Sequence, residues 1–218
     1  MQIAITGHDA SGKQLDLRNA EGLSAWLPTL SVSTGTCALL TAGPATGKTW
    51  LTSQVVMHSL HRALVPVVIK VEHLQKELTE HEAAFQAAPN WVDAHLQRTC
   101  EPPHYAMLHA AMEQRRLLLL IDGLDEAGAA RARIEAHVAE VLAPQGHTML
   151  CTSRPAGLDE ARFAAFHKLQ LAPLTEAQQQ GFLAARLGAA RAAELKPYLR
   201  DKVPLDVETQ RSVTANPL

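Results

Sequence analysis

The segment Thr41-Ala42-Gly43-Pro44-Ala45-Thr46-Gly47-Lys48-Thr49 follows an apolar run, Cys37–Thr41, and opens an amphipathic segment whose apolar residues recur at three- and four-residue steps. A glycine-containing turn between a strand and a helix directs backbone N–H groups at a bound phosphate. A lysine at its end adds positive charge, and the next hydroxyl can ligate Mg²⁺. The segment therefore predicts a phosphate-binding loop in which Lys48 contacts phosphate and Thr49 contacts the metal.

Two positions depart from the usual pattern GxxxxGK[ST]. Its first glycine falls at position 42, where this chain has Ala42, and Ala45 stands where many such loops carry another glycine. We expect Gly43 to supply the missing flexibility. The predicted nucleotide contacts come from the loop and the start of the following helix: Gly43, Pro44, Ala45, Thr46, Gly47, Lys48, Thr49 and Trp50.

A second element, further along the chain, combines a buried strand with acidic residues. The apolar run Leu117–Ile121 is followed by DGLDE, which contains Asp122, Asp125 and Glu126. Like charges this close together resist joint ionisation unless a cation lies among them. We expect Asp122 to hold Mg²⁺ at the end of the strand, which leaves Glu126 or Asp125 to orient or deprotonate an attacking water.

A third element is the short strand and polar turn of His147–Pro155, which reads HTMLCTSRP. Taken alone it is a strand end capped by a Ser/Thr turn. In series with the other two elements, it places Thr152, Ser153 and Arg154 where a γ-phosphate could be sensed.

Strand and helix patterns alternate around these three elements. Apolar strands are predicted at Cys37–Thr41, Val65–Val71, Leu117–Ile121, Thr148–Cys151 and His167–Leu171. Helices are predicted at Thr49–Ala63, His73–Ala87, His104–Arg116 and Ala127–Leu142. Continuous apolar strands separated by helices favour an α/β fold, a three-layer α/β/α sandwich around a parallel sheet.

The two ends of the chain have different patterns. Gln2–Thr6 and Gln14–Leu17 flank a turn-rich stretch and predict a hairpin, after which Asn19 caps a short helix. Thr175 opens a helix to about Leu187, and a second helix follows. We therefore divide the chain into residues 1–34 (hairpin and short helix), 35–173 (nucleotide-binding domain) and 174–218 (the start of a helical domain).

Composition excludes several classes of protein. The 218 residues carry a formal net charge of -2 and only 4% aromatic side chains, so neither a basic surface nor a stacking platform for nucleic acid is expected. The three cysteines are far apart and predict reduced thiols. The N-terminus lacks signal-peptide features, and no apolar run is long enough to cross a bilayer. We expect a cytoplasmic protein with no membrane partner.

Together, GKT, DGLDE and TSRP occur in the order and approximate spacing of NACHT domains, the signal-transducing P-loop ATPases of the STAND class within the wider AAA+ relatives. The segment Leu169–Glu176 resembles the NACHT strand that leads into the first helical domain. Ala215–Leu218 resembles the start of that domain's proline motif, which implies that Pro217 touches the nucleotide base. The resemblance covers roughly residues 35–218.

The resemblance implies a sheet order in which the TSRP strand lies between the phosphate-loop and DGLDE strands. It makes Lys48 and Thr49 the phosphate and Mg²⁺ residues, with Asp122 as the metal-side carboxylate. Glu126 becomes the more favoured catalytic carboxylate and Arg154 the sensor. NACHT ATPases continue through further helical, winged-helix and sensor domains, so we expect any homo-oligomer or signalling partner protein to bind through domains that this sequence lacks.

The resulting hypothesis is an ATP-binding, Mg²⁺-dependent switch domain that hydrolyses ATP slowly to ADP. Adenine is favoured because no NKxD-like guanine-reading element is present. Three alternatives stay open: a module that holds ATP or ADP without turnover, a P-loop enzyme such as a small-molecule kinase, and an interaction scaffold with a vestigial site.

Two weaker patterns are interpreted structurally. Gly7–Lys13 also fits GxxxxGK, but Gln14 replaces the Ser/Thr and no apolar helix follows, so we interpret it as a hairpin turn. His73, Glu77 and His81 share a helix face at four-residue steps, and we interpret them as a solvated surface rather than a metal site.

Overall fold

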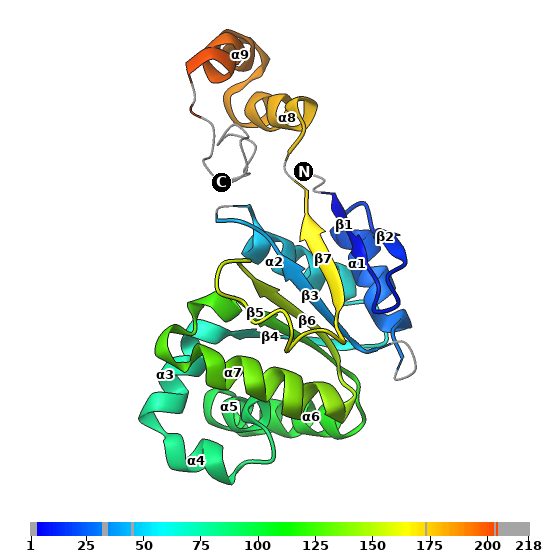
Figure 1. Ribbon diagram of the computed structural model, residues 1–218, viewed down its shortest axis with the longest axis vertical. Helices are drawn as coiled ribbons and strands as arrows, with labels where there is room; N and C mark the ends of the chain where they lie inside the picture. Colours follow the sequence, from blue (N-terminus) through cyan, green and yellow to red (C-terminus); the bar gives the residue numbers. More distant parts are fainter. Residues whose placement is uncertain (1–3, 32–34, 45, 173, 203, 205–218) are drawn as a thin grey trace.

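The computed structural model describes residues 4–31, 35–44, 46–172, 174–202 and 204 of the chain. In this part, one mostly parallel sheet has the order β2-β1-β7-β3-β6-β5-β4 (Figure 1). Its strands are β1 (Ile5–His8), β2 (Gln14–Asp16), β3 (Cys37–Thr41), β4 (Val65–Lys70), β5 (Leu117–Asp122), β6 (Thr148–Ser153) and β7 (His167–Leu171). The α-helices are α1 (Ala20–Trp26), α2 (Lys48–Ser59), α3 (Val71–Glu80), α4 (Glu82–Ala87), α5 (Trp91–Thr99), α6 (Pro102–Glu113), α7 (Arg131–His137), α8 (Glu176–Leu187) and α9 (Ala189–Lys202).

The strand order agrees with the one that the resemblance implied. Strand β6, which ends in TSR, lies between β3 and β5 and pairs with both in parallel. Strands β4 and β7 extend the parallel part on either side. The ends of β3, β5 and β6 therefore meet at one edge of the sheet, on the side where α8 and α9 stand (Figure 1).

Successive side chains of β5 point to opposite faces of the sheet, so its run of leucines packs into the cores on both faces. Leu117, Leu119 and Ile121 belong to the core under α3–α7. Leu118 and Leu120 belong to the core under α1 and α2. All five side chains are buried, as expected for a central parallel strand covered on both sides. The predicted three-layer α/β/α architecture is confirmed.

Beyond β7 the sheet has only two layers. Strand β1 pairs antiparallel with both β7 and β2, so the N-terminal hairpin extends the same sheet. Ile5 and Leu169 are buried on the face that packs against α1 and α2. The opposite face carries polar, exposed side chains, as alternation requires of a sheet with one solvated face: Thr6, His8, Gln14, Asp16 and Gln170.

The first strand of the hairpin extends further along the chain than the sequence pattern predicted. Strand β1 continues past Thr6 to His8, because the Asp9 carboxylate accepts the backbone N–H groups of Ser11 and Lys13 and closes the turn there. Gln2 and Ile3, where the predicted strand began, lie outside the described residues. The Gly7–Lys13 pattern thus forms a hairpin, as we interpreted it. Gly7 pairs so closely with β7 that an added Cβ would lie 1.9 Å from the Lys168 carbonyl oxygen.

Two predicted helices end earlier than expected. The helix predicted over Thr49–Ala63 ends at Ser59, so Leu60 is 56% exposed instead of packing on the sheet. The helix predicted over His104–Arg116 ends at Glu113, because Arg115 has a positive φ of 53° that leaves the helical region. Periodicity alone does not detect such a stop when no glycine or proline marks it.

Two other predicted helices are broken. His81, at φ -133° and ψ 38°, divides the segment His73–Ala87 into α3 and α4. The segment Ala127–Leu142 is a 3-10 turn, then α7, then a π-helical turn over Val138–Leu142. Helix α5, capped by Asn90, was not predicted; the Asn side chain accepts from Asp93 N–H, which is a capping signal that the sequence does contain.

The helices after the sheet follow the prediction. Thr175 and Gln178 form a reciprocal capping box at the start of α8. Helices α8 and α9 pack on each other and stand beyond the end of β7 (Figure 1). None of the helices in the described ranges is long and apolar enough to span a bilayer.

We expect the fold to lose stability in mild acid because of His137. Burial lowers its pKa to about 4, while its Nε2 accepts the Trp91 N–H at 3.0 Å and its ring stacks on the indole. An unfolded histidine titrates near pH 6.5, so this stabilisation is present above that pH and is lost as the pH falls towards 4. Because His137 is only partly buried, the loss is about 1–2 kcal/mol.

Urea unfolding of the wild type and of His137→Gln at pH 7.5 and 5 measures this loss. Glutamine keeps an acceptor for the Trp91 N–H but does not titrate, so the variant is expected to lose less stability in acid. Equal losses in the two proteins would assign the acid sensitivity to other groups.

Candidate functional site

The loop between β3 and α2 has the geometry of an anion-binding turn. Ala42 is buried, and its N–H donates to the Ser153 carbonyl oxygen at 3.1 Å, so the loop leaves the sheet beside the end of β6. Gly47 has φ 87° and ψ 25°, a left-handed conformation that favours glycine, and α2 begins at the next residue. The first N–H groups of a helix have no partner within the helix, which suits them to a phosphate.

We expected Gly43 to supply the flexibility that is lost where Ala42 replaces a glycine, and the structure does not show this. Ala42 has no positive φ, so alanine fits this position without strain. Gly43 does not take a positive φ either, and an added Cβ would meet only Thr46 Cγ2 at 3.8 Å. In this conformation, therefore, no special flexibility of Gly43 is used to compensate for Ala42.

Lys48 points back into its own loop. Its Nζ donates to the carbonyl oxygens of Ala42 and Gly43 at 3.0 and 3.1 Å. Burial lowers the pKa of Lys48, while the charges of Asp125, Asp122 and Glu126 act in the opposite direction. The ammonium group is thus held beside loop carbonyl oxygens and within electrostatic reach of three carboxylates, where a bound anion could also accept from it.

Asp122 is buried at the end of β5 and is held by two threonines. Thr152 donates its hydroxyl to Asp122 Oδ1 at 2.6 Å and accepts the N–H of Gly123 at 2.9 Å. The hydroxyl of Thr52, on α2, lies 3.4 Å from the same carboxylate oxygen. Sequence analysis did not identify Thr52, and it placed Thr152 beside a γ-phosphate rather than on Asp122. A carboxylate at the end of a buried strand needs donors, and threonines on the neighbouring strand and helix were the available signal.

Asp125 and Arg154 form an ion pair in which Arg154 contacts both carboxylate oxygens. The Arg154 Nε lies 2.9 Å from Asp125 Oδ2, and the Arg154 backbone N–H donates to Asp125 Oδ1 at 2.9 Å. The Asp125 side chain is 8% exposed, whereas that of Arg154 is 49% exposed. Both carboxylate oxygens of Asp125 are therefore engaged, and Arg154 is tied to the acidic element rather than free.

Glu126 is the third carboxylate of the DGLDE element, and it is exposed. It lies on a 3-10 turn, Leu124–Glu126, and its carboxylate folds over Gly123, where an added Cβ would meet Glu126 Oε2 at 2.9 Å. The pKa of Glu126 is raised, first by burial and then by the negative charges of Asp125 and Asp122. Gly123 has φ 81°, a left-handed conformation that favours glycine.

Among the other predicted site residues, Thr152 and Ser153 have different surroundings from those expected. Thr152 and Ser153 are fully buried, and the Ser153 hydroxyl donates to the Arg154 carbonyl oxygen, so neither hydroxyl is displayed to a phosphate. Thr49, Trp50 and Pro44 are exposed near the start of α2. Ala45 and Pro217 lie outside the described residues.

The donor set fits magnesium rather than a softer metal. Thr49 offers a hydroxyl and Asp122 a carboxylate, which are hard oxygen ligands of the kind that Mg²⁺ uses together with water and phosphate oxygens. Three acidic or histidine ligand atoms within 4.8 Å of one another occur in the described residues only at Glu77, Glu80 and His81, at the end of α3. Glu77 is paired there with Arg98 at 2.8 Å.

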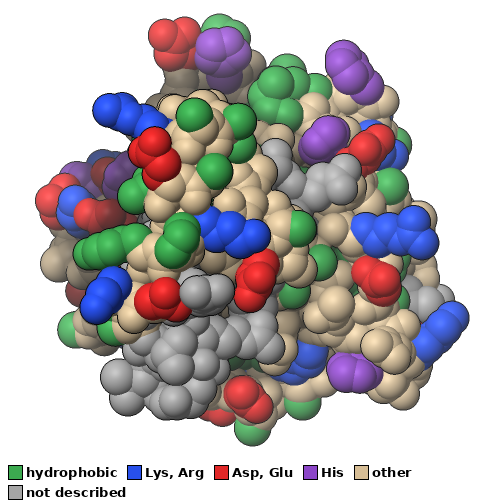
Figure 2. Space-filling view, turned by 90° about the horizontal axis from the view of Figure 1, so that it is seen from above, with side chains coloured by type: hydrophobic (Ala, Val, Ile, Leu, Met, Phe, Trp, Pro, Cys, Tyr) green, Lys and Arg blue, Asp and Glu red, His purple; other side chains and the backbone are tan. Residues whose placement is uncertain are grey.

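The surface at this end of the molecule has no single sign of charge. Seen from above, lysine and arginine side chains are interspersed with acidic and histidine side chains (Figure 2).

The chain is similar to several solved structures. Neither a family model nor a curated protein matches the sequence. A structure described as a DNA replication initiation factor is 11% identical, with a TM-score of 0.51, and the match covers 87% of this chain and 55% of that one. PCH-2 of C. elegans is 15% identical with a TM-score of 0.46, covering 88% of this chain and 53% of that one. The chain thus spans about half the length of both.

At such low identity the likeness concerns the fold alone. Together with the sheet order, the parallel strands and the glycine turn at the start of α2, it shows that this chain has the three-layer α/β/α fold of P-loop NTPases.

Proposed function

We propose that this chain is an ATP-binding, Mg²⁺-dependent switch domain of the NACHT type that hydrolyses ATP slowly. The observation that carries the proposal is the meeting of three segments at one edge of the sheet. Lys48, after β3, lies within electrostatic reach of Asp122, Asp125 and Glu126 at the end of β5 and of Arg154 at the end of β6. Nucleotide hydrolases use this combination of a phosphate-binding loop, a carboxylate at a strand end and a further acidic residue.

Each residue has a distinct proposed role. Lys48 and the N–H groups at the start of α2 bind the phosphates, and Thr49 with Asp122 holds Mg²⁺, which supplies charge neutralisation at the phosphates when bound. Glu126 accepts a proton from the attacking water, since Asp125 is engaged by Arg154. We expect Arg154 to exchange its pairing with Asp125 for the terminal phosphate, which makes the ion pair a sensor of nucleotide state.

A slow reaction is supported by the geometry around Arg154 and Lys48. Both cations are bonded to protein oxygens, Arg154 to a carboxylate and Lys48 to two carbonyls, and these bonds must be replaced before either side chain can stabilise a transition state. Such rearrangement suits a switch better than a metabolic enzyme. A domain that binds ATP or ADP without turnover is the second candidate. Nucleotide could bind while Arg154 keeps its bond to Asp125, and hydrolysis would then not follow.

Nucleotide content tests the proposal first. Protein purified without added nucleotide is denatured gently and the supernatant is analysed by ion-exchange chromatography, beside thermal unfolding with Mg-ATP, Mg-ADP and AMP. We expect retained ADP, or a rise in Tm with Mg-ATP and Mg-ADP that AMP does not produce. Phosphate release then separates slow hydrolysis from binding alone. Empty protein that no nucleotide stabilises would favour the scaffold hypothesis.

A further inference from the structure

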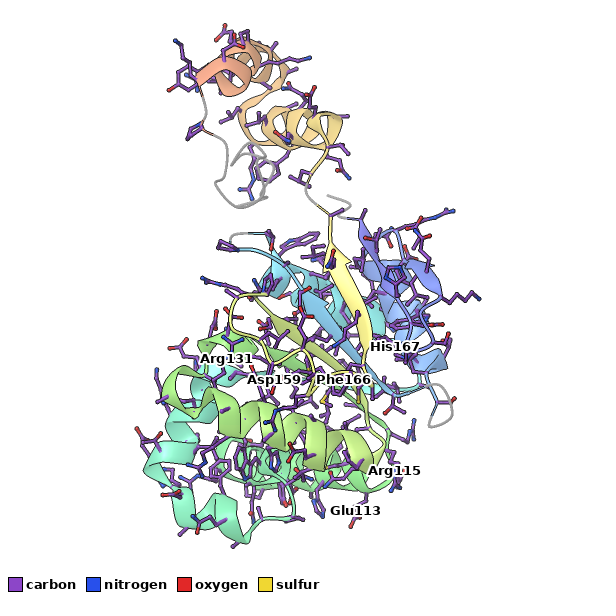
Figure 3. The ribbon with its side chains drawn as sticks, viewed as in Figure 1. Glu113, Arg115, Arg131, Asp159, Phe166 and His167 are labelled. Atoms are coloured by element: carbon purple, nitrogen blue, oxygen red, sulfur yellow. The ribbon has the colours of Figure 1, made fainter. Side chains whose placement is uncertain are left out.

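A pocket lies at the end of the sheet opposite to Lys48. It has a volume of about 560 Å³, within the size range of small-molecule sites. It opens where β3 and β6 begin, between the π-helical turn Val138–Leu142 and the segment before β7. Most of its lining is apolar, with Cys37, Ala139, Pro144 and Phe166 among the contributors. In Figure 3, Arg115 and Phe166 both lie toward this end of the molecule, away from α8 and α9.

Two arginines line the pocket, and their charges are not equivalent. Arg162 is paired with Glu140 and with Asp159, the latter at 3.5 Å, so its charge is compensated within the protein. Arg115 donates its Nε to the Gln145 carbonyl oxygen at 2.7 Å but makes no ion pair with any described residue. A guanidinium has five donors, so Arg115 keeps donors and a full positive charge for another partner.

The backbone conformation of Arg115 is a second, independent indication that its side chain has a role in binding. The N–H groups of Arg115 and Arg116 bond to the carbonyls of Met112 and Ala111, so Arg115 occupies the left-handed position after α6 that usually carries glycine. Arg115 and Arg18 are the two non-glycine residues with positive φ in the described ranges. A strained residue of this kind persists at binding sites when its side chain has a role there. The π-helical turn beside the pocket is another feature that concentrates at functional sites.

We propose that this pocket binds a small organic monoanion, with its carboxylate on Arg115 and an apolar body against Phe166 and Ala139. A planar guanidinium matches a carboxylate in a bidentate arrangement. One uncompensated cation in an apolar pocket balances one negative charge, whereas a phosphate ester would bring a second charge that no described lining residue neutralises. The site is distinct from the predicted nucleotide site, and it does not depend on the proposed function.

Binding of 4-phenylbutyrate and of its neutral analogue 4-phenylbutan-1-ol to the full chain tests the proposal. Isothermal titration calorimetry compares the wild type with Arg115→Gly and with the matched control Arg116→Gly, whose arginine does not line the pocket. On the wild type we expect the acid to bind at least about tenfold more tightly than the alcohol. Arg115→Gly removes that preference and Arg116→Gly keeps it.

Stability distinguishes loss of the charge from loss of the fold. Glycine relieves the left-handed strain at position 115, so Arg115→Gly is expected to unfold at the same temperature as the wild type or higher. Ala139→Leu, which narrows the pocket, should weaken both ligands. The proposal is overturned if neither ligand binds, if acid and alcohol bind equally to the wild type, or if the preference survives in Arg115→Gly.

Discussion

Replacing Lys48 with alanine is expected to weaken Mg-ATP binding by at least about 100-fold while leaving the fold intact. The ammonium group bonds only to the loop carbonyls of Ala42 and Gly43 among the described residues, so its removal breaks no strand or core contact. Burial lowers the pKa of Lys48, which means that its surroundings disfavour the charged form. A bound phosphate supplies the opposite charge, so the lysine contributes more in the complex than alone.

The chain contains a matched control for this experiment. Lys13 ends a second GxxxxGK pattern, but it lies in the β1–β2 hairpin turn and is exposed. Lys13→Ala should bind Mg-ATP like the wild type. Trp50, two residues after Lys48 and 37% exposed, offers a fluorescence readout of binding beside calorimetry. If Lys48→Ala binds Mg-ATP with unchanged affinity, the loop does not hold phosphate.

The sequence was sufficient for the fold wherever a pattern extended over a whole element. Apolar runs identified β3 to β7, and the run at Leu117–Ile121 required cover on both faces because it does not alternate. The position of β6 between β3 and β5 followed from a resemblance, since spacing along a chain contains no information about strand order. Helix ends were less predictable: His81 and Arg115 stop helices through backbone conformations that their residue types do not announce.

The candidate site was predictable in its composition but not in its pairings. Sequence patterns brought Lys48, Asp122 and Arg154 to the correct edge of the sheet. They could not show that Arg154 is bonded to Asp125, or that Thr152 faces inward to Asp122 rather than outward to a ligand. Those facts depend on side-chain direction at strand ends, where two residues at adjacent positions point to opposite sides.

These pairings also change what the acidic element can do. The sequence left either Glu126 or Asp125 to act on the attacking water, but the structure gives these two carboxylates different surroundings. Asp122 is fixed by hydroxyls and Asp125 by an arginine, whereas Glu126 has a raised pKa. A carboxyl group whose pKa is raised by burial and then by neighbouring negative charges is the one best suited to exchange a proton.

Glu126→Gln is therefore expected to retain ATP while its hydrolysis slows by at least about 100-fold, the contribution of a positioned general base. Glutamine has the same shape over Gly123 but cannot accept the proton of water. In the wild type, protonation inactivates the base, so the hydrolysis rate should fall as the pH drops through the raised pKa of Glu126, above the ordinary glutamate value. Phosphate release across pH 5–8, with ATP binding measured in parallel, tests both statements.

Stability and a neighbouring variant complete the test of Glu126. Because its folded pKa is raised, the ionised carboxylate destabilises the fold above that pKa, and the penalty disappears below the unfolded value. Glu126→Gln should thus unfold at a higher temperature than the wild type at pH 8, with the difference shrinking towards pH 4.5. Asp125→Asn breaks the ion pair with Arg154 and should alter nucleotide affinity as well as rate. If Glu126→Gln hydrolyses ATP normally and Asp125→Asn does not, the general base is Asp125, and Arg154 must leave it before each turnover.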